Sequence, residues 1–466
     1  MNTPATPETR SGLTRGMGLF PALAANMLQM VGVGPFLTIP LILSTMHGPQ
    51  ALAGWILGAL LATCDGLVWA ELGAAMPDSG GSYDYLQQAF GPQSLGRLMG
   101  FLFLWQVMLA APLTAASGGV GFADYARYLL PGLTAPEQKI LAVVVCLLAT
   151  ILLYRDIRAV GRISTILWIG LMLAMALIIW GGIRHFDAAR AFDFPAGAFV
   201  LSPGFFLGLG AATLISMYDY SGYFTVCLIG GEVKNPSVTI PRCVLLSIGI
   251  LAVLYVAMSL SIIGVVPWRE ALGSHAIVSD FMQRLYGAKA AALMTGLILW
   301  VAFASVFCVL LGYTRVPYAA ASEGHFFSAF ARLHPTRGFP SFSVVFMGVL
   351  SAVACLLTLE ALIKALIVIQ IITQFVAQCV AVILIRRYRR NIVRPFSMPL
   401  YPFPVMIALA GWIFILASSG AAYVLSGFAL LALGIAAYLW RAHRKMEWPW
   451  KLDPAKPHAG STGDLI

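Results

Sequence analysis

Two short stretches of the chain combine helix-breaking residues with polar groups inside apolar segments. They are Gly32-Val33-Gly34-Pro35 and Tyr218-Asp219-Tyr220-Ser221-Gly222. A broken helix frees backbone N–H and C=O groups, and inside a bilayer such groups are tolerated only where they line a cavity. N–H groups at the start of a half-helix attract an anion such as a carboxylate. A pair of breaks at corresponding positions of two halves therefore predicts the binding site of a secondary transporter.

The second stretch adds side chains with chemistry of their own. Asp219 is an ionisable group inside an apolar segment, and such groups are functional by default. Unwound carbonyls from about Met217 to Asp219 offer acceptors for an ammonium group. The ring of Tyr218 is a candidate gate over that group, with a cation–π contribution on the order of 0.5–2 kcal/mol. The alternatives are aromatic packing for the tyrosines and, at Gly32 and Gly34, close contact between helices.

The elements that position these residues are membrane-spanning helices. Of the 466 residues, 60% are hydrophobic and 10% are charged, whereas soluble domains carry about 25% charged residues. A span needs roughly 20 mostly apolar residues. The twelve candidate segments are residues 19–45, 51–76, 97–129, 138–154, 161–183, 203–229, 242–266, 289–319, 342–359, 361–386, 404–423 and 425–441.

The net charge of +10 follows the predicted topology and does not indicate a nucleic-acid partner. Twelve spans with the N-terminus inside place 21 of the 29 Lys and Arg residues on the cytoplasmic side, as the positive-inside rule requires. This predicts a cytoplasmic tail over residues 1–16, a transporter domain over 17–445 and a second cytoplasmic tail over 446–466. The lipid bilayer of the cell membrane is then the surrounding partner.

Other classes of function lack their motifs. The seven cysteines are scattered in or beside apolar runs, without CxxC or histidine at metal-ligand spacing, so neither a disulfide, a metal nor a cofactor is expected. The chain has no nucleotide-binding loop and no Gly-x-Ser-x-Gly or HExxH site, and we expect a protein that is not an enzyme. The oligomeric state is left open.

Four groups of residues resemble the amino acid–polyamine–organocation (APC) superfamily, in the order and spacing of that family from about residue 20 to 340. The stretches are Val31-Gly32-Val33-Gly34-Pro35-Phe36; Ala70-Glu71-Leu72 with Pro77-Asp78-Ser79-Gly80-Gly81-Ser82-Tyr83 and Ala89-Phe90-Gly91-Pro92; Gly231-Glu232-Val233-Lys234-Asn235-Pro236 with Ile240-Pro241-Arg242; and Thr314-Arg315-Val316-Pro317-Tyr318-Ala319 with Ser322-Glu323-Gly324.

The resemblance implies an all-α, leucine-transporter-like fold with a 5+5 inverted repeat, in which helices 1 and 6 are broken. The repeats cover about 19–183 and 203–386, and two extra helices cover 404–441. The resemblance also implies roles for individual residues. Substrate carboxylate is bound by a loop at Gly32, Val33 and Gly34, and the amine is bound by carbonyls at Met217, Asp219 and Ser221. Gating is assigned to the aromatic ring of Tyr218 and to Glu232 and Lys234. Glu232 and Lys234 are expected to pair with the basic loop between spans eight and nine.

The coupling ion is the least determined part of this interpretation. Many proton-coupled or exchanging members carry a lysine in span five, whereas this chain has Leu171 there. Asp65 falls where the polyamine-uptake branch carries a glutamate. Because an ionised carboxylate is costly inside the membrane, Asp65 and Asp219 are candidate proton carriers. Sodium remains the alternative, at a position near the first break and Ser305.

A polar face on span ten completes the candidate site. Gln370, Gln374 and Gln378 follow one another at four-residue spacing, and Gln370 is the best candidate for the permeation path by depth. We therefore expect a secondary transporter that moves amino acids by alternating access, as a symporter or an exchanger. The alternative substrate is a polyamine, with Asp219 holding a second amine.

Overall fold

The computed structural model describes residues 13–78, 80–357 and 370–450. The first twelve residues of the predicted N-terminal tail and residues 451–466 of the C-terminal tail lie outside the described residues. So do Ser79 of the second motif, the last two residues of segment 342–359, and residues 361–369 of segment 361–386.

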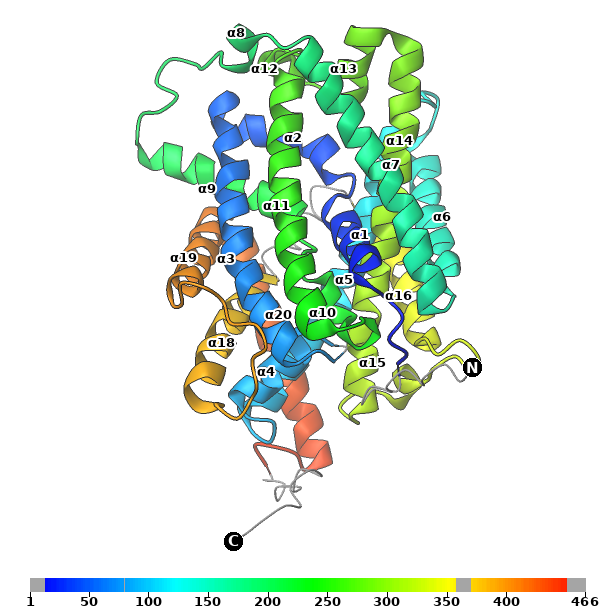
Figure 1. Cartoon of the computed structure of the whole chain (residues 1–466), viewed down its shortest axis with the longest axis vertical. Coiled ribbons are helices and arrows are strands. Elements are labelled where there is room, and N and C mark those ends of the chain that lie inside the picture. The colour runs from blue at the N-terminus through cyan, green and yellow to red at the C-terminus, as the bar shows by residue number, and fades with distance from the viewer. Residues whose placement is uncertain (1–12, 79, 358–369, 451–466) are drawn as a thin grey trace.

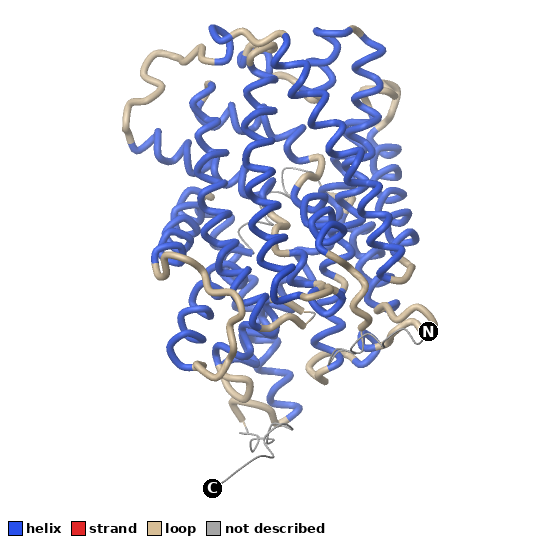
Figure 2. Tube along the Cα trace, viewed as in Figure 1, coloured by secondary structure: helices blue, strands red, loops and turns tan. Residues whose placement is uncertain are grey.

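The described chain is all-α, as predicted. Figure 2 shows helices joined by loops, with no strand in the part of the chain that the structure describes. Met17 and Val233 form one isolated parallel bridge. The long helices run roughly along the longest axis of the molecule. The short helices α8 (Ala188–Ala191), α12 (Trp268–Ala271) and α13 (Ile277–Tyr286) lie together at its upper end (Figure 1).

Each of the twelve predicted segments contains helix. The corresponding elements are α1 (Leu19–Met30) with α2 (Gly34–Met46), η1 (Pro49–Leu52) with α3 (Ala53–Ala75), α5 (Leu95–Ala126), α6 (Ala135–Leu153), α7 (Ile157–Arg184), α9 (Pro203–Tyr220) with α10 (Thr225–Leu228), α11 (Pro236–Ile263), α14 (Ala288–Tyr313) with α15 (Arg315–Ser322), α16 (Ser341–Ala354), η4 (Ile371–Val376) with α18 (Ala377–Tyr388), α19 (Phe403–Ser418) and α20 (Ala421–Lys445).

The structure contains further helices between these segments, which are not among those expected from the sequence. They are α4 (Ser82–Phe90), α8 (Ala188–Ala191), η2 (Gly230–Glu232), α12 (Trp268–Ala271), α13 (Ile277–Tyr286) and η3 (Ser328–Ala331). They connect or cap the long helices and are too short to span a bilayer.

Within the described ranges, eight helices are long and apolar enough to cross a membrane, or up to nine if α1 and α2 count as one bent span. The apolar helices α16 and α19 are shorter, with 14 and 16 residues. Ile151, Val253 and Leu293 leave 68%, 69% and 75% of their surface exposed on three of the long helices. Such apolar outer surface is unfavourable in water and suits contact with lipid.

The helix break predicted at the first glycine-containing stretch is confirmed. Helix α1 ends at Met30, α2 begins at Gly34, and the two axes differ by 41°. Pro35 stands in the first turn of α2, where a missing N–H breaks no helical hydrogen bond. The helix at the second stretch also ends where predicted, because α9 stops at Tyr220 and Gly222 adopts a φ of +125°.

The surrounding helices fix these breaks in place. Helix α1 packs against α7, α11 and α14, while α2 packs against α9. The most extensive helix pairs are α3 with α11 and α5 with α14. Helix α6 begins with a capping box, in which the N–H and hydroxyl of Thr134 donate to the Glu137 carboxylate.

Candidate functional site

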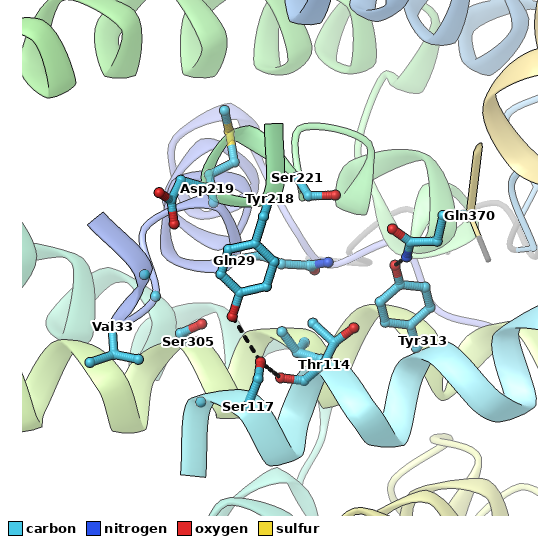
Figure 3. A pocket seen from close by; sticks show the side chains of 15 residues that line it. Gln29, Val33, Thr114, Ser117, Tyr218, Asp219, Ser221, Ser305, Tyr313 and Gln370 are labelled. Atoms are coloured by element: carbon cyan, nitrogen blue, oxygen red, sulfur yellow. Dashed lines mark hydrogen bonds between the residues drawn. The ribbon is translucent and has the colours of Figure 1, made fainter. Parts of the chain in front are cut away.

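A cavity lies between the two helix breaks, and 15 residues from five parts of the chain line it (Figure 3). They are Gln29, Met30, Gly32, Val33, Gly34, Thr114, Ser117, Gly118, Tyr218, Asp219, Ser221, Ser305, Val309, Tyr313 and Gln370. Seven of the eight residues predicted for substrate binding are among them. The exception is Met217, which is buried and does not line the cavity.

The glycines of the first break allow close approach of other elements. A Cβ built on Gly32 would lie 2.9 Å from the Ser305 Oγ on α14. A Cβ built on Gly34 would lie 1.9 Å from Asp219 Oδ1 and 3.2 Å from Tyr218 Cε1. Both glycines therefore line the cavity and also permit close packing between segments.

The Asp219 side chain joins the second break to α2. Its Oδ2 accepts a hydrogen bond of 2.5 Å from the Thr38 hydroxyl, whereas Oδ1 has no hydrogen-bond partner among the described residues. Asp219 is 1% exposed. Its backbone carbonyl accepts a 3.0 Å bond from the Tyr255 hydroxyl, which also lies 3.0 Å from the Met30 carbonyl. Tyr255 thus connects the ends of the two broken helices.

Tyr218 crosses the cavity toward α5. Its hydroxyl lies 2.9 Å from the Ser117 Oγ, and Ser117 donates in turn to the Thr114 carbonyl at 2.7 Å (Figure 3). Sequence reasoning missed this wall of the cavity, formed by Thr114, Ser117 and Gly118. The available signal was two hydroxyl residues and glycine shortly after Pro112 inside an apolar segment.

Gln370 closes the opposite side of the cavity. Its Nε2 donates to the Tyr313 hydroxyl at 3.1 Å (Figure 3). The other two glutamines of the predicted polar face lie outside the lining. Gln378 accepts a hydrogen bond from Ser82, and the Gln374 amide has no partner within the described residues.

Two amides preceding the first break tie it to the second. Asn26 Nδ2 donates to the Tyr223 carbonyl at 2.7 Å, and Asn26 Oδ1 accepts from the Val226 N–H at 2.8 Å. Gln29 lines the cavity and accepts from the Thr225 hydroxyl. Asn26 therefore satisfies backbone groups in the segment after α9 and in the first turn of α10.

Asp65 lies outside the cavity, in a separate buried network. Its Oδ2 accepts a 2.6 Å bond from the Tyr223 hydroxyl, and its Oδ1 accepts a 3.1 Å bond from Trp412 Nε1. The Trp412 ring stacks on Phe375, with centroids 4.1 Å apart. Both carboxylate oxygens of Asp65 have partners, whereas only Oδ2 of Asp219 has one among the described residues.

Glu232 forms a buried ion pair at the start of α15. Arg315 Nε lies 2.9 Å from Glu232 Oε2, and Arg315 NH2 lies 3.2 Å from Oε1, with side chains 1% and 2% exposed. The expectation that the basic loop after residue 319 supplies this partner is wrong, because Arg315 belongs to the preceding helical segment. Lys234 is exposed, and its backbone N–H donates to the Met17 carbonyl.

The cavity lining contains one carboxylic acid and no basic side chain among the described residues. Asp219 is the only Asp, Glu, Lys, Arg or His among the lining residues that the structure describes. No cluster of three or more metal-ligating side chains occurs within the described residues. The lining offers hydroxyl, amide and carboxylate groups and helix termini, which are groups of the kind that can bind a small polar molecule. The site has the features of a membrane permease, in which broken helices line a cavity inside an apolar bundle.

Comparison with known proteins places the chain within this class. The profile described as "Amino acid permease" matches residues 17–438, so the chain belongs to the amino acid permease family of the APC superfamily. It is 26% identical to the serine/threonine exchanger SteT of Bacillus subtilis, over 88% of this chain and 92% of the relative. It is 29% identical to the human large neutral amino acids transporter small subunit 2, over 92% of this chain and 83% of the relative. A third relative, the branched-chain amino acid permease BcaP of Bacillus subtilis, is 26% identical over 95% of this chain and 96% of the relative.

The relatives and the apolar helices together identify a multi-pass membrane protein. The resemblance noted from the four motif groups is thereby confirmed, since the profile covers all four.

The hydrogen bond between Tyr218 and Ser117 gives a testable prediction. We expect Tyr218→Phe and Ser117→Ala each to weaken substrate binding by about 0.5–1.5 kcal/mol, because each removes one partner of the same bond. The double variant should then cost about as much as either single variant. Equilibrium binding of an amino acid that stabilises the purified protein measures all four affinities. Fully additive losses would show that the two residues act independently.

Proposed function

We propose that the protein is a secondary active transporter that moves amino acids across the cell membrane by alternating access. The observation that carries the proposal is the polar cavity between the two helix breaks. The proposal includes twelve spans with the 5+5 inverted repeat over 19–183 and 203–386, extra helices over 404–441, and both terminal tails in the cytoplasm. The first described segment and the end of α20 lie toward the same end of the bundle (Figure 1), which supports this topology.

In this proposal the substrate lies between the breaks. Its carboxylate binds the backbone at Gly32, Val33 and Gly34, at the positive end of α2. Its ammonium group binds carbonyls near Met217, Asp219 and Ser221, and Tyr218 closes over it. Gln370 lines the opposite wall. The proposal is supported by the shared cavity lining of these residues, Met217 excepted.

Protons are the proposed coupling ion, with Asp65 or Asp219 as carrier. Asp219 is favoured by its place in the cavity lining and its unpartnered oxygen. Asp65 is linked to the second break through Tyr223. Sodium coupling and substrate exchange remain the competing mechanisms.

We propose that the ion pair of Glu232 and Arg315 acts as a gate and that Lys234, close by in the chain, takes part in it. The pair joins the segment after the second break to the junction between α14 and α15. The backbone of Glu232 and Lys234 also pairs with Gly16 and Met17. Movement of the broken helix relative to α14 would therefore have to open this set of contacts.

Uptake into proteoliposomes tests the proposal. Purified protein is reconstituted and offered labelled serine, leucine, lysine and putrescine under separate proton and sodium gradients, with protein-free vesicles as control. We expect accumulation of at least one amino acid, driven by the proton gradient. Accumulation driven by sodium alone would contradict the coupling ion. Transport of putrescine without any amino acid would contradict the substrate class.

A further inference from the structure

The Asp219 carboxylate lies at the N-terminus of α2. Gly34 is the first residue of that 13-residue helix, and a Cβ on Gly34 would lie 1.9 Å from Asp219 Oδ1. Thr38, one turn further along α2, donates its hydroxyl to Asp219 Oδ2 at 2.5 Å. Figure 3 shows Asp219 on the same side of Tyr218 as Val33, the residue before this helix. The chain therefore supplies its own carboxylate to the helix end that a substrate carboxylate would occupy.

This helix end has few N–H groups for two anions. Pro35 has no N–H, and the Phe36 N–H donates to the Val33 carbonyl at 3.1 Å. A helix N-terminus stabilises roughly half an elementary charge of opposite sign. Two ionised carboxylates at this one helix end would repel each other in an environment of low dielectric constant, where like charges interact more strongly than in water.

Within the part of the chain that the structure describes, the surroundings of Asp219 offer no compensating cation. Its Oδ1 has no partner among the described residues, at 1% exposure. The groups facing it are the Thr38 hydroxyl from α2, Tyr218 from α9 and Tyr255 from α11, and none of these is charged. The lining contributed by α5, α14 and Gln370 contains no Lys, Arg, His, Asp or Glu within the described residues. A buried carboxylate oxygen in this position calls for a proton or a ligand cation.

We propose that Asp219 and the substrate carboxylate compete for the N-terminus of α2, so that the site always loads one net positive charge. A zwitterionic amino acid enters together with a proton, which passes from water onto Asp219 Oδ1 and leaves that carboxyl neutral. An amine that lacks a carboxylate enters alone and pairs with ionised Asp219. The inference rests on the proposed substrate site and adds the charge that this site accepts.

The competition predicts opposite pH dependences for two ligands that differ by one carboxylate. Alanine should bind the wild-type protein more tightly as pH falls, by up to about tenfold per pH unit where one proton is taken up. Ethylamine should bind more tightly as pH rises. Equilibrium binding of both ligands to the full-length purified protein between pH 5.5 and 8.5 measures these slopes.

Variants test whether the pH dependence of alanine and ethylamine binding comes from the Asp219 side chain. Asp219→Asn should make alanine binding independent of pH and reduce ethylamine binding at least tenfold. Thr38→Val, a milder change, should strengthen alanine binding at pH 8 because the carboxylate is held less firmly on α2. Asp187 is a half-buried aspartate outside the cavity, so Asp187→Asn is the matched control and should leave both slopes unchanged.

The outcomes separate this inference from the proposed function. If alanine binds with no pH dependence, or with the same slope as ethylamine, the competition is refuted while the amino acid permease stands. Retention of both slopes in Asp219→Asn also refutes it. If no amino acid binds at any pH, the proposed substrate site itself fails. The comparison of alanine with ethylamine on the wild-type protein tests the competition even if a variant does not fold.

Discussion

Replacing Gly34 with alanine is expected to lower substrate uptake about 100-fold, the scale of loss that follows from a displacement of about 1 Å in a binding site. The new Cβ would lie 1.9 Å from Asp219 Oδ1 and 3.2 Å from Tyr218 Cε1. Either Asp219 gives up its hydrogen bond to Thr38, or α2 moves away from the second break. Both changes disturb the helix end proposed to bind the substrate carboxylate. Uptake into proteoliposomes at equal reconstituted protein measures the loss.

Gly249→Ala is the matched control for this variant. Gly249 lies within α11, and a Cβ there meets no atom within 4 Å, so uptake should be unchanged. Combining Gly34→Ala with Asp219→Ser tests whether the clash with Asp219 is the cause. The shorter serine side chain removes the clash and should restore the thermal stability that the clash takes from Gly34→Ala. Wild-type uptake by Gly34→Ala alone would show that the close approach of Asp219 to α2 is unimportant.

Replacing Arg315 with alanine is expected to lower the free energy of unfolding by about 3–5 kcal/mol, because Glu232 is left as an uncompensated buried charge. The two side chains are 1% and 2% exposed and share two hydrogen bonds. Thermal unfolding of the purified protein, followed in detergent at constant lipid content, measures the loss as a lower melting temperature.

The ion pair of Arg269 and Asp193 provides the control, with side chains 60% and 44% exposed. Arg269→Ala should cost at most about 1 kcal/mol, as is usual for exposed pairs. The double variant Glu232→Gln with Arg315→Met should recover much of the lost stability, since no charge remains buried. A double variant as unstable as Arg315→Ala would show that Arg315 acts through packing and not through its charge.

Sequence reasoning predicted the parts of the fold that depend on local composition. The first helix break follows from two glycines and a proline inside one apolar segment, and the structure confirms its position between Met30 and Gly34. Apolar runs located the helices, and within the described residues eight of these, or nine with α1 and α2 as one bent span, are long and apolar enough to cross a membrane. The break after Tyr220 was found because Ser221 and Gly222 follow a carboxylate in an otherwise apolar stretch.

The remaining parts depend on contacts between distant segments. Ser117 joins the site because α5 packs across the cavity from α9, and its own neighbours in sequence give only a weak signal. Thr38 looks like an ordinary helix residue until α2 is placed beside Asp219. Asp65 and Asp219 were equivalent carboxylates in the sequence, and only the packing shows that Asp219 alone lines the cavity.

The most direct test of the central claim, that substrate binds between the two helix breaks, is chemical modification of a cysteine placed in the cavity. Ser305→Cys is nearly isosteric, and Ser305 lines the cavity beside Gly32. The seven native cysteines are buried, so the wild-type protein is the control for a small, charged methanethiosulfonate reagent. We predict that modification of Ser305→Cys abolishes binding of the transported amino acid, and that this amino acid protects the cysteine from the reagent. Full binding after complete modification would contradict the account.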